Sequence, residues 1–527
     1  MNFEFKLSSR RNLKRGLMAI AALALLTLLF YGEEDWRGKR AWEKCKRDLE
    51  TRGEVLDWNK FIPPPVPDTQ NFALTPIVAS CYSRILDKSG HRIEPQNTNV
   101  VNRLEMNFYS SQRAAPADVT NNWQKGTAIN LKAWQEYFRA PMDTNFLNWP
   151  PAATNEFTVT PEPQSPAADV LLALSKYDSA IEELRQASAL PHSRFPLNYD
   201  EPLPQEILLP HLKSLRFCAD ILQLHAAAEL QNGQNERALD DVKLTLKLAN
   251  SIHDEPVEIS QRLRISIVGN AIQPIWEGLA GHKWTEAQLA EIERELAGLD
   301  FLSDYDFVVR SERAMDLQLI DRERHTHNAE VGPFLCGDEC YDFRTRMVLF
   351  YYHSFPSGWF YQNNITIAIA FQQSVRTDSE VKKRILSPQI EQRIGNVIGE
   401  AYFHYRSPYY FYFPMIFPDF GPKARIFAFG QSSIDMARMA CALERYRLAN
   451  GIYPETLDAL APNFIDSIPH DVTNDQPLHY RRTDDGRFLL YSLGWNEEDD
   501  GGVVALSTGG REVDTRKGDW VWQLPAK

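Results

Sequence analysis

The hydrophobic pattern near the amino terminus is one long apolar run. Residues 17–31 carry no charge, and they follow a tail in which five basic side chains accompany a single acidic one. Because positive charge is retained on the cytoplasmic side, this pattern predicts a cytoplasmic tail over 1–16, a transmembrane anchor over 17–32 and an exported body. The run is shorter than the usual span of about 20 residues, but no small-residue cleavage site follows it. We therefore expect an uncleaved signal-anchor and a single-pass protein of the inner membrane, with a cleaved signal peptide as the alternative.

The stretch after the anchor is dense in alternating charge. Within it, Trp36, Trp42 and Leu49 recur about two turns apart, which predicts a mostly solvated stalk helix with one apolar edge. The prolines of 61–67 favour a stiff, polyproline-like spacer. We expect residues 33–67 as a whole to hold the body away from the membrane.

The pattern over residues 68–140 is mixed. It contains a candidate strand at 99–109 and a short amphipathic helix at 131–139. Residues 141–166 are rich in Pro, Asn and Thr, so they are predicted to form an irregular linker.

A helical pattern follows over residues 167–433. Apolar residues recur there at steps of three and four, which predicts a helical domain, and Thr285 is a typical N-cap for one of its helices. Aromatic residues are frequent over 331–422. We expect them to pack between helices, the alternative being a partner-binding or sugar-binding surface.

One helical pair within this domain has a recognisable pattern. The stretch "CADILQLHAAAELQNGQNERALDDVKLTLKLA" has a helix, Gly233 at the turn and Ala238 early in a second helix. It resembles a single tetratricopeptide repeat over 218–252, with Glu229 in place of the usual aromatic and Thr245 in place of the usual Ala. The resemblance implies a helical hairpin, and an ordinary helical bundle is the alternative.

The last pattern combines a helix with alternating strands. A helix with an apolar stripe ends at Asn450-Gly451, and a short second helix follows over 453–462. Strand residues alternate on both sides of Asp485-Gly486, a typical hairpin turn pair, and 519–525 is predicted to add a strand. Residues 434–527 are therefore expected to form a small α+β domain.

This order of motifs resembles the C-terminal globular domain of major pseudopilins of type II secretion systems. The likeness lies in "ALERYRLANGIYPETLDAL", "PLHYRR", "FLLYSLG" and the trailing acidic loop, over residues 434–524. In that family the loop commonly binds calcium, so the resemblance implies Asp499 and Asp500 as metal ligands, together with Glu498 and Ser492. A solvated loop is the alternative. The family's processed amino-terminal segment is missing from this chain, so the resemblance implies a module at the end of a larger protein.

The composition narrows the classes of function. A length of 527 residues favours about three structural units. The net charge of -13 is the opposite of the basic surface that a nucleic-acid binder carries. Six cysteines are too few for a disulfide scaffold. Only Cys336 and Cys340 lie close together, either as a local disulfide or as two unrelated thiols.

The sequence motifs of common catalytic chemistry are missing. The chain has no G-x-x-x-x-G-K phosphate loop, no G-x-G-x-x-G, no H-E-x-x-H and no G-x-S-x-G. The polar segment 321–327 is predicted to be surface, and Arg310 and Arg313 are predicted to form ion pairs within a helical bundle. We therefore nominate no catalytic and no cofactor-binding residue, and calcium is the one metal that the sequence suggests.

These patterns together predict a mainly α protein: a membrane anchor, a helical-hairpin body and a small carboxy-terminal α+β domain. With the bulk periplasmic and no catalytic motif, we expect a non-catalytic scaffold that interacts with a protein partner in the cell envelope and not with nucleic acid. Two alternatives stay open, an exported hydrolase acting on polysaccharide or peptide and an accessory factor of a secretion or pilus-like machine.

Overall fold

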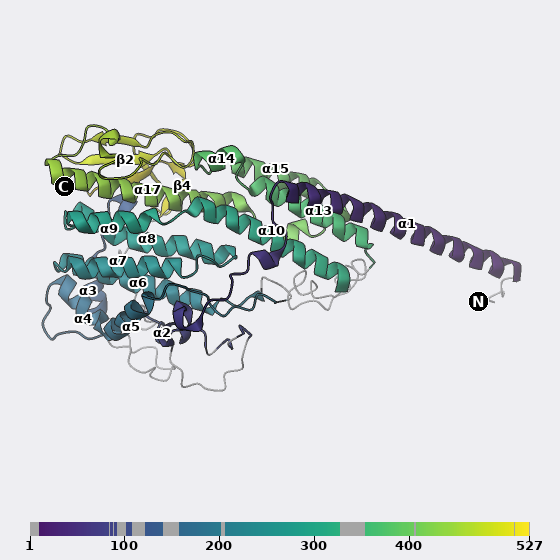
Figure 1. The fold of residues 1–527 in the computed structure, drawn as a ribbon, viewed down its shortest axis with the longest axis horizontal. Coiled ribbons are helices and arrows are strands. Elements are labelled where there is room, and N and C mark those ends of the chain that lie inside the picture. The colour runs from purple at the N-terminus through teal and green to yellow at the C-terminus, as the bar shows by residue number, and fades with distance from the viewer. Residues whose placement is uncertain are drawn as a thin grey trace, which may run out of the picture. The chain divides into compact units, whose positions relative to one another are not determined.

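The computed structural model is mainly helical. It describes residues 10–83, 85–87, 89–91, 102–107, 122–140, 157–201, 206–326, 354–404, 407–510 and 512–525. One long apolar helix lies near the amino terminus and a small sheet region lies near the carboxyl end (Figure 1). These coarse features of the predicted fold class are confirmed.

The chain divides into two compact units. The first unit comprises Met1–Lys60, Arg310–Val375 and Arg393–Asp419. The second unit comprises Phe61–Val309, Arg376–Gln392 and Phe420–Lys527.

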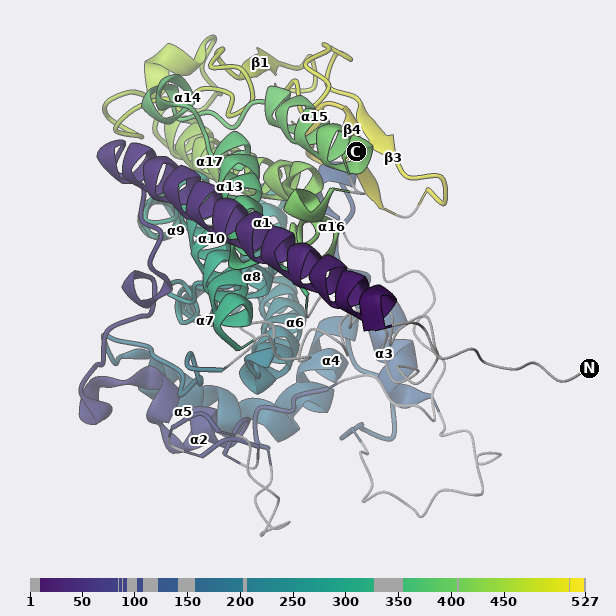
Figure 2. The same cartoon turned by 90° about the vertical axis from the view of Figure 1, so that its right-hand side faces the viewer.

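The first unit is built around α1 (Arg10–Thr51) and α13 (Ser357–Ser374), which pack against each other. Figure 2 shows α1 as one unbroken helix, so the predicted anchor and stalk are continuous. The predicted apolar edge of the stalk is wrong at Trp36, which is 63% exposed, whereas Gly38 and Leu49 are buried. The buried edge follows Gly38 because the backbone of α13 comes too close there for a large side chain.

Aromatic side chains fill the rest of the first unit. They come from α13, the 3-10 turn η8 (Pro408–Tyr410) and α16 (Phe413–Ile416). Phe360 and Tyr412 are fully buried, and Phe355 meets Phe411 edge-on. Packing between helices is therefore confirmed here, while Phe403 is 84% exposed. Other aromatics of the expected runs lie outside the described residues.

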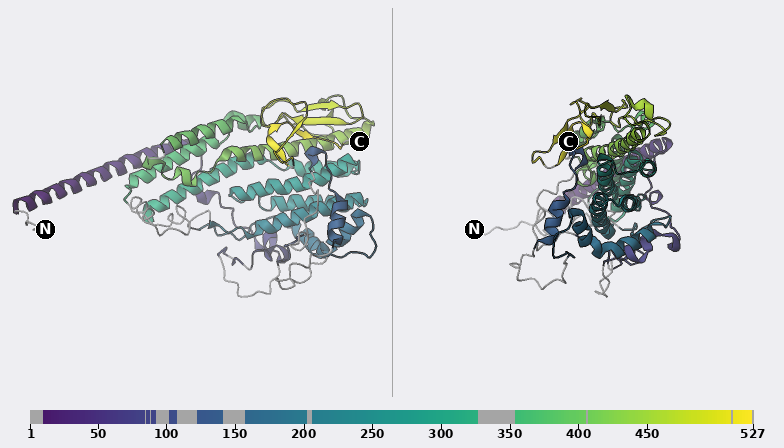
Figure 3. Two further views of the ribbon diagram at one scale, coloured as in Figure 1. Left: turned by 180° about the vertical axis from the view of Figure 1, so that it is seen from behind. Right: turned by 90° about the vertical axis from the view of Figure 1, so that its left-hand side faces the viewer.

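The second unit is a stack of helices (Figures 1 and 3). The hairpin of α6 and α7 packs on α8, and α8 and α9 pack on α17. Its α-helices are α2 (Pro76–Ala79), α3 (Leu131–Arg139), α4 (Pro166–Leu174), α5 (Asp178–Ser188), α6 (Pro210–Gln231), α7 (Asn235–Asn250), α8 (Glu258–Ala280), α9 (Glu286–Ala297), α14 (Asp378–Lys383) and α17 (Phe420–Asn450). Two further helices, α10 (Phe301–Thr326) and α15 (Gln389–Phe403), contribute to both units.

Local signals account for several helix ends in this stack. Thr285 caps α9 in a capping box with Gln288, as predicted. The helix expected at 131–139 has the bounds of α3, and the side chain of Asn130 accepts a hydrogen bond from the backbone N–H of Ala133. No strand forms in the described residues 102–107 of the candidate strand.

The proline-rich stretch 61–67 lies against the second unit. The guanidinium of Arg194 donates to the carbonyl oxygen of Pro63 at 3.0 Å, and the rings of Phe61 and Phe307 are 5.8 Å apart. These contacts fix the stretch in place as a docked segment.

The carboxy-terminal sheet packs on α17, which begins earlier than predicted, at Phe420. The expected hairpin forms, because β1 (His479–Arg482) pairs antiparallel with β2 (Phe488–Ser492) around the turn at Gly486. The strand expected near the end is β5 (Trp520–Trp522), which pairs with β2. A second ribbon joins β3 (Val504–Leu506) and β4 (Val513–Gly518). The short segment after α17 forms a 3-10 turn, η9 (Leu457–Leu460).

Candidate functional site

The amino-terminal half of α1 presents an exposed apolar surface. Its large apolar side chains from Leu13 to Phe30 are between 46% and 70% exposed. This part of the helix is about 27 Å long at 1.5 Å per residue, which is close to the hydrocarbon thickness of a bilayer. By length and composition, the helix can cross a membrane.

The other half of α1 is seated on α13 through two glycines. A Cβ atom added to Gly38 would lie 2.7 Å from the Cα of Gly358, and one added to Gly358 would lie 2.8 Å from the backbone N of Asp35. Ordinary carbon contacts are about 3.5–4.0 Å. The two backbones therefore touch, and only glycine fits at both positions.

Acidic side chains at the start of the stalk add hydrogen bonds to this contact between α1 and α13. The Asp35 carboxylate accepts from the backbone N–H of Gly358 at 2.7 Å, where α13 begins without a side-chain cap of its own. A carboxylate at that end is favoured by the helix dipole. Glu34 is 6% exposed and accepts from the Trp359 indole at 3.1 Å and from the Tyr409 hydroxyl at 3.0 Å.

A second set of contacts, made by Glu54, holds the chain just after α1. Glu54 accepts from Arg313 at 2.6 Å and from Arg310 at 3.0 Å. Burial opposes ionisation of Glu54, but the hydrogen bonds and charges of the two arginines lower its pKa. The prediction that these arginines form ion pairs within a helical bundle is confirmed.

A groove on the second unit combines apolar walls with exposed cations. Its volume is about 540 Å³. It is lined by Leu212, Lys213, Arg216, Phe217, Ile259, Arg262, Leu263, Ser266 and Ile426. Lys213, Arg216 and Arg262 are exposed, and Ile259 is 50% exposed. Such a surface suits an extended or helical segment that carries both apolar and acidic side chains.

A larger cavity, of about 810 Å³, is also lined by residues of the second unit. Asp435 lies in its lining and is nearly inaccessible to solvent, and burial raises the pKa of this carboxyl to about 6 although Arg438 opposes the shift. Lys382, Lys383 and Arg384 also line the cavity. A buried acid beside a cavity is a candidate proton donor.

The loop residues that the sequence suggests for calcium differ in burial. Ser492 is buried and its hydroxyl accepts from the backbone N–H of Gly494. Asp499 accepts from the Tyr491 hydroxyl at 3.1 Å, while Glu498 and Asp500 are exposed.

The loop is closed by Asp519, a residue that the sequence analysis did not single out. Its buried carboxylate accepts from the backbone N–H groups of Gly502 at 2.6 Å and Val503 at 3.3 Å. The calcium site stays a prediction. Cys336 and Cys340 lie outside the described residues.

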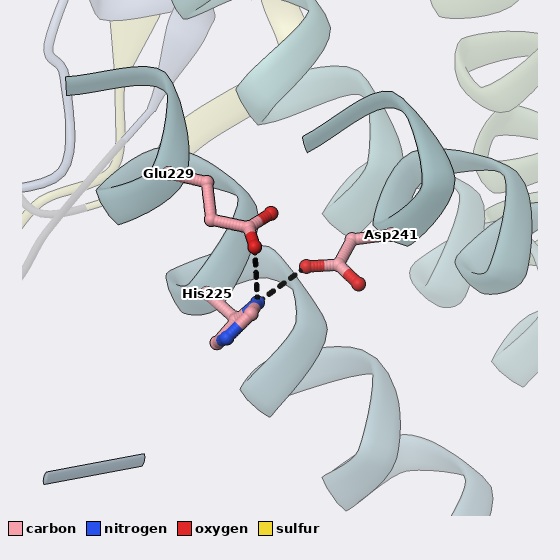
Figure 4. A group of neighbouring side chains, drawn as sticks. All are labelled: His225, Glu229 and Asp241. Atoms are coloured by element: carbon pink, nitrogen blue, oxygen red, sulfur yellow. Dashed lines mark hydrogen bonds and ion pairs between the residues drawn. The ribbon is translucent and has the colours of Figure 1, made fainter. Parts of the chain in front are cut away.

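The described part of the chain holds one group of three His, Asp or Glu side chains with converging ligand atoms. His225 and Glu229 lie one turn apart on α6, and Asp241 lies on α7 across the turn at Gly233. Figure 4 shows the three side chains pointing toward one another. One ligand atom from each falls within 4.8 Å of the other two, and all three residues are buried.

The cluster is an ion-pair network with one unsatisfied member. His225 Nδ1 lies 2.6 Å from Asp241 Oδ2 and 3.6 Å from Glu229 Oε1, and Arg185 pairs with Asp241 Oδ1. Glu229 is 0% exposed and neither of its carboxylate oxygens has a hydrogen-bond partner. Burial and the charge of Asp241 raise the pKa of Glu229.

In the sequence, Glu229 stands out only as a departure from the tetratricopeptide pattern, and neither His225 nor Asp241 is predicted as a site residue. A signal was available, because His225 and Glu229 stand i, i+4 among alanines and leucines on the apolar part of α6. Polar residues at such positions must find partners in the core.

No protein-family model matches the chain, and neither does any of the curated proteins or solved structures with which it was compared. Its function is therefore inferred from its own residues.

Proposed function

We propose that the protein is a single-pass, membrane-anchored scaffold of the cell envelope that binds a partner protein through its helical body. The observation that carries the proposal is the continuity of α1, whose apolar half is exposed while its polar half is seated on α13. An apolar surface of that length is unfavourable in water and favourable in a bilayer. A single helix thus joins the membrane to a folded unit.

The charge of the amino-terminal tail supports an orientation with the tail in the cytoplasm and the bulk in the periplasm. The helix, hairpin and acidic loop at the carboxyl end support a pseudopilin-like module, and the α6–α7 hairpin supports a tetratricopeptide-like unit. Both modules suit a protein that works through contacts with other proteins, including an accessory role in a secretion or pilus-like machine.

The groove of the second unit is the surface that we assign to the partner. Its three exposed cations, Lys213, Arg216 and Arg262, favour an acidic segment, and its apolar walls favour large side chains on the same segment. An amphipathic helix or strand with acidic residues along one edge meets both requirements.

Anchoring and partner binding are tested separately. A membrane-anchored chain stays in the membrane fraction after high-salt and alkaline washes, and recovery in the soluble fraction would refute the anchor. For the partner, the full-length protein is cross-linked in cells and its partners are quantified. The variant Lys213→Glu/Arg262→Glu is expected to lose them.

The matched control is Lys132→Glu/Arg294→Glu. It reverses two exposed cations on other helices of the same unit. Equal recovery of partners by the groove variant and the control variant would refute the assignment of the groove.

One observation favours the hydrolase alternative. The carboxyl of Asp435, with its pKa raised to about 6 by burial, lies in the lining of the larger cavity together with His470 and Asp475. A carboxyl with a pKa of about 6 keeps a protonated fraction near neutral pH, which suits general acid catalysis. This alternative requires the full-length protein to release reducing ends or amines from envelope polymers, and requires Asp435→Asn to abolish that release. Turnover that is equal in wild type and variant would exclude Asp435 as the acid.

A further inference from the structure

The buried cluster of His225, Glu229 and Asp241 has the composition of a metal site. It offers one imidazole nitrogen and two carboxylate oxygens, a mixed set that suits divalent first-row ions such as Zn²⁺. Two of the ligands come from one face of α6 and the third from α7, so an ion would join the two arms of the hairpin.

Glu229 points to a ligand beyond the protein's own atoms. Its side chain is 0% exposed and both its oxygens lack a hydrogen-bond partner. The nearest cations are the imidazole of His225 at 3.6 Å and the guanidinium of Arg237 at 3.9 Å, and the Arg237 side chain is 65% exposed. A buried carboxyl group whose oxygens have no hydrogen-bond partner is unfavourable in either protonation state, and an ion bound at these oxygens would satisfy them.

The distances are close to those that a bound ion requires. Tetrahedral coordination with bonds of about 2.0–2.1 Å places neighbouring ligand atoms about 3.3 Å apart. His225 Nδ1 and Glu229 Oε1 are already 3.6 Å apart. His225 Nδ1 and Asp241 Oδ2, at 2.6 Å, would have to separate by less than about 1 Å.

Neighbouring groups already hold the Asp241 carboxylate in a suitable orientation. Arg185 binds its Oδ1 atom and leaves Oδ2 facing His225. Partners of this kind orient the ligands of a metal ion and raise its affinity.

We propose that His225, Glu229 and Asp241 bind one divalent first-row transition-metal ion and that the ion links α6 to α7. Zn²⁺ is the probe for this site. Three protein ligands leave one position for water. Since binding occurs only in the folded hairpin, the ion stabilises the second unit.

The test uses full-length protein in detergent, stripped with chelator and titrated with Zn²⁺ and Co²⁺. We expect one ion per chain, a rise in melting temperature at stoichiometric Zn²⁺ and the visible absorption of ligand-bound Co²⁺. Glu229→Gln and His225→Gln each remove a direct ligand, so each is expected to weaken binding by more than the about 10- to 100-fold that loss of an outer-shell partner costs. Glu229→Gln keeps the size and shape of the side chain and places no charge in the core, so it is expected to fold.

The matched control is Asp240→Asn, which changes an exposed carboxylate next to Asp241 and should leave binding unchanged. Absence of stoichiometric binding in the wild type would overturn the proposal. Binding that survives in both cluster variants would also overturn it, since the ion would then lie elsewhere on the surface.

Discussion

The contact between Gly38 and Gly358 gives the sharpest prediction about the anchor helix. Replacing Gly38 by Ala places a Cβ atom 2.7 Å from the Cα of Gly358, about 1 Å inside ordinary contact distance. Backbone atoms cannot rotate away as a side chain can, so the two helices must separate. Overpacking of this kind costs about 1–3 kcal/mol, which raises the undocked population of the stalk by about 5- to 150-fold.

Limited proteolysis in detergent measures that population. Trypsin sites lie along the stalk from Arg37 to Arg52, and cleavage requires the segment to undock and unwind. When opening and closing are fast relative to cleavage, the cleavage rate follows the population of the open state. We therefore expect Gly38→Ala to be cut about 5- to 150-fold faster than the wild type.

The matched control is Gly32→Ala, on the same helix, where an added Cβ meets nothing within 4 Å. Both substitutions gain the higher helix propensity of Ala, so their difference isolates the contact. Gly358→Ala should act like Gly38→Ala, and the double variant should cost less than the sum, because one separation relieves both clashes. Equal cleavage rates for Gly38→Ala and Gly32→Ala would refute the close contact between Gly38 and Gly358.

Three further predictions concern the second unit. Burial raises the pKa of Asp435 from 3.8 to about 6, so the free energy of unfolding of the wild type falls as pH rises from about 4 to 6. Asp435→Asn should therefore be more stable than the wild type by about 3 kcal/mol in urea at pH 7.5, but not at pH 4. A difference in stability between variant and wild type that is the same at both pH values would contradict this prediction. Hydrogen bonds to Asp254 and Asp304 raise the pKa of His253 to about 9. The stabilisation that these bonds provide is therefore present below pH 6.5 and is lost as pH rises through 9. His253→Ala should destabilise the protein at pH 6 but not at pH 10. Millimolar calcium should raise the melting temperature of the wild type but not that of Asp499→Asn. If calcium leaves the melting temperature of the wild type unchanged, the predicted calcium site in the loop is refuted.

Features written in a few consecutive residues could be predicted from the sequence. The bounds of α3 follow from its amphipathic pattern and the cap at Asn130. The carboxy-terminal hairpin follows from strands that alternate around Gly486, which adopts the positive φ that the turn requires. In each case the deciding interactions join residues close together in the chain, so the local pattern contains the information.

The features that matter most for function join distant residues. Gly38 and Gly358 are 320 positions apart, and neither has a local reason to be glycine, since both lie inside helices. His225 and Asp241 meet only because the α6–α7 turn fixes the register of the two helices. Predicting such contacts requires the relative placement of helices, which periodicity does not supply.

The contacts that hold the two ends of the polar half of α1 have a mechanical consequence for the apolar half. Glu34 and Asp35 hold the start of the polar half, and Glu54 holds its end through Arg310 and Arg313. Arg313 is 0% exposed, so breaking its pair would leave a buried charge at a cost of about 3–5 kcal/mol. A helix seated at both ends transmits force and orientation, whereas a flexible linker of the same length would transmit neither. The apolar half of α1 and the first unit should therefore move as one body.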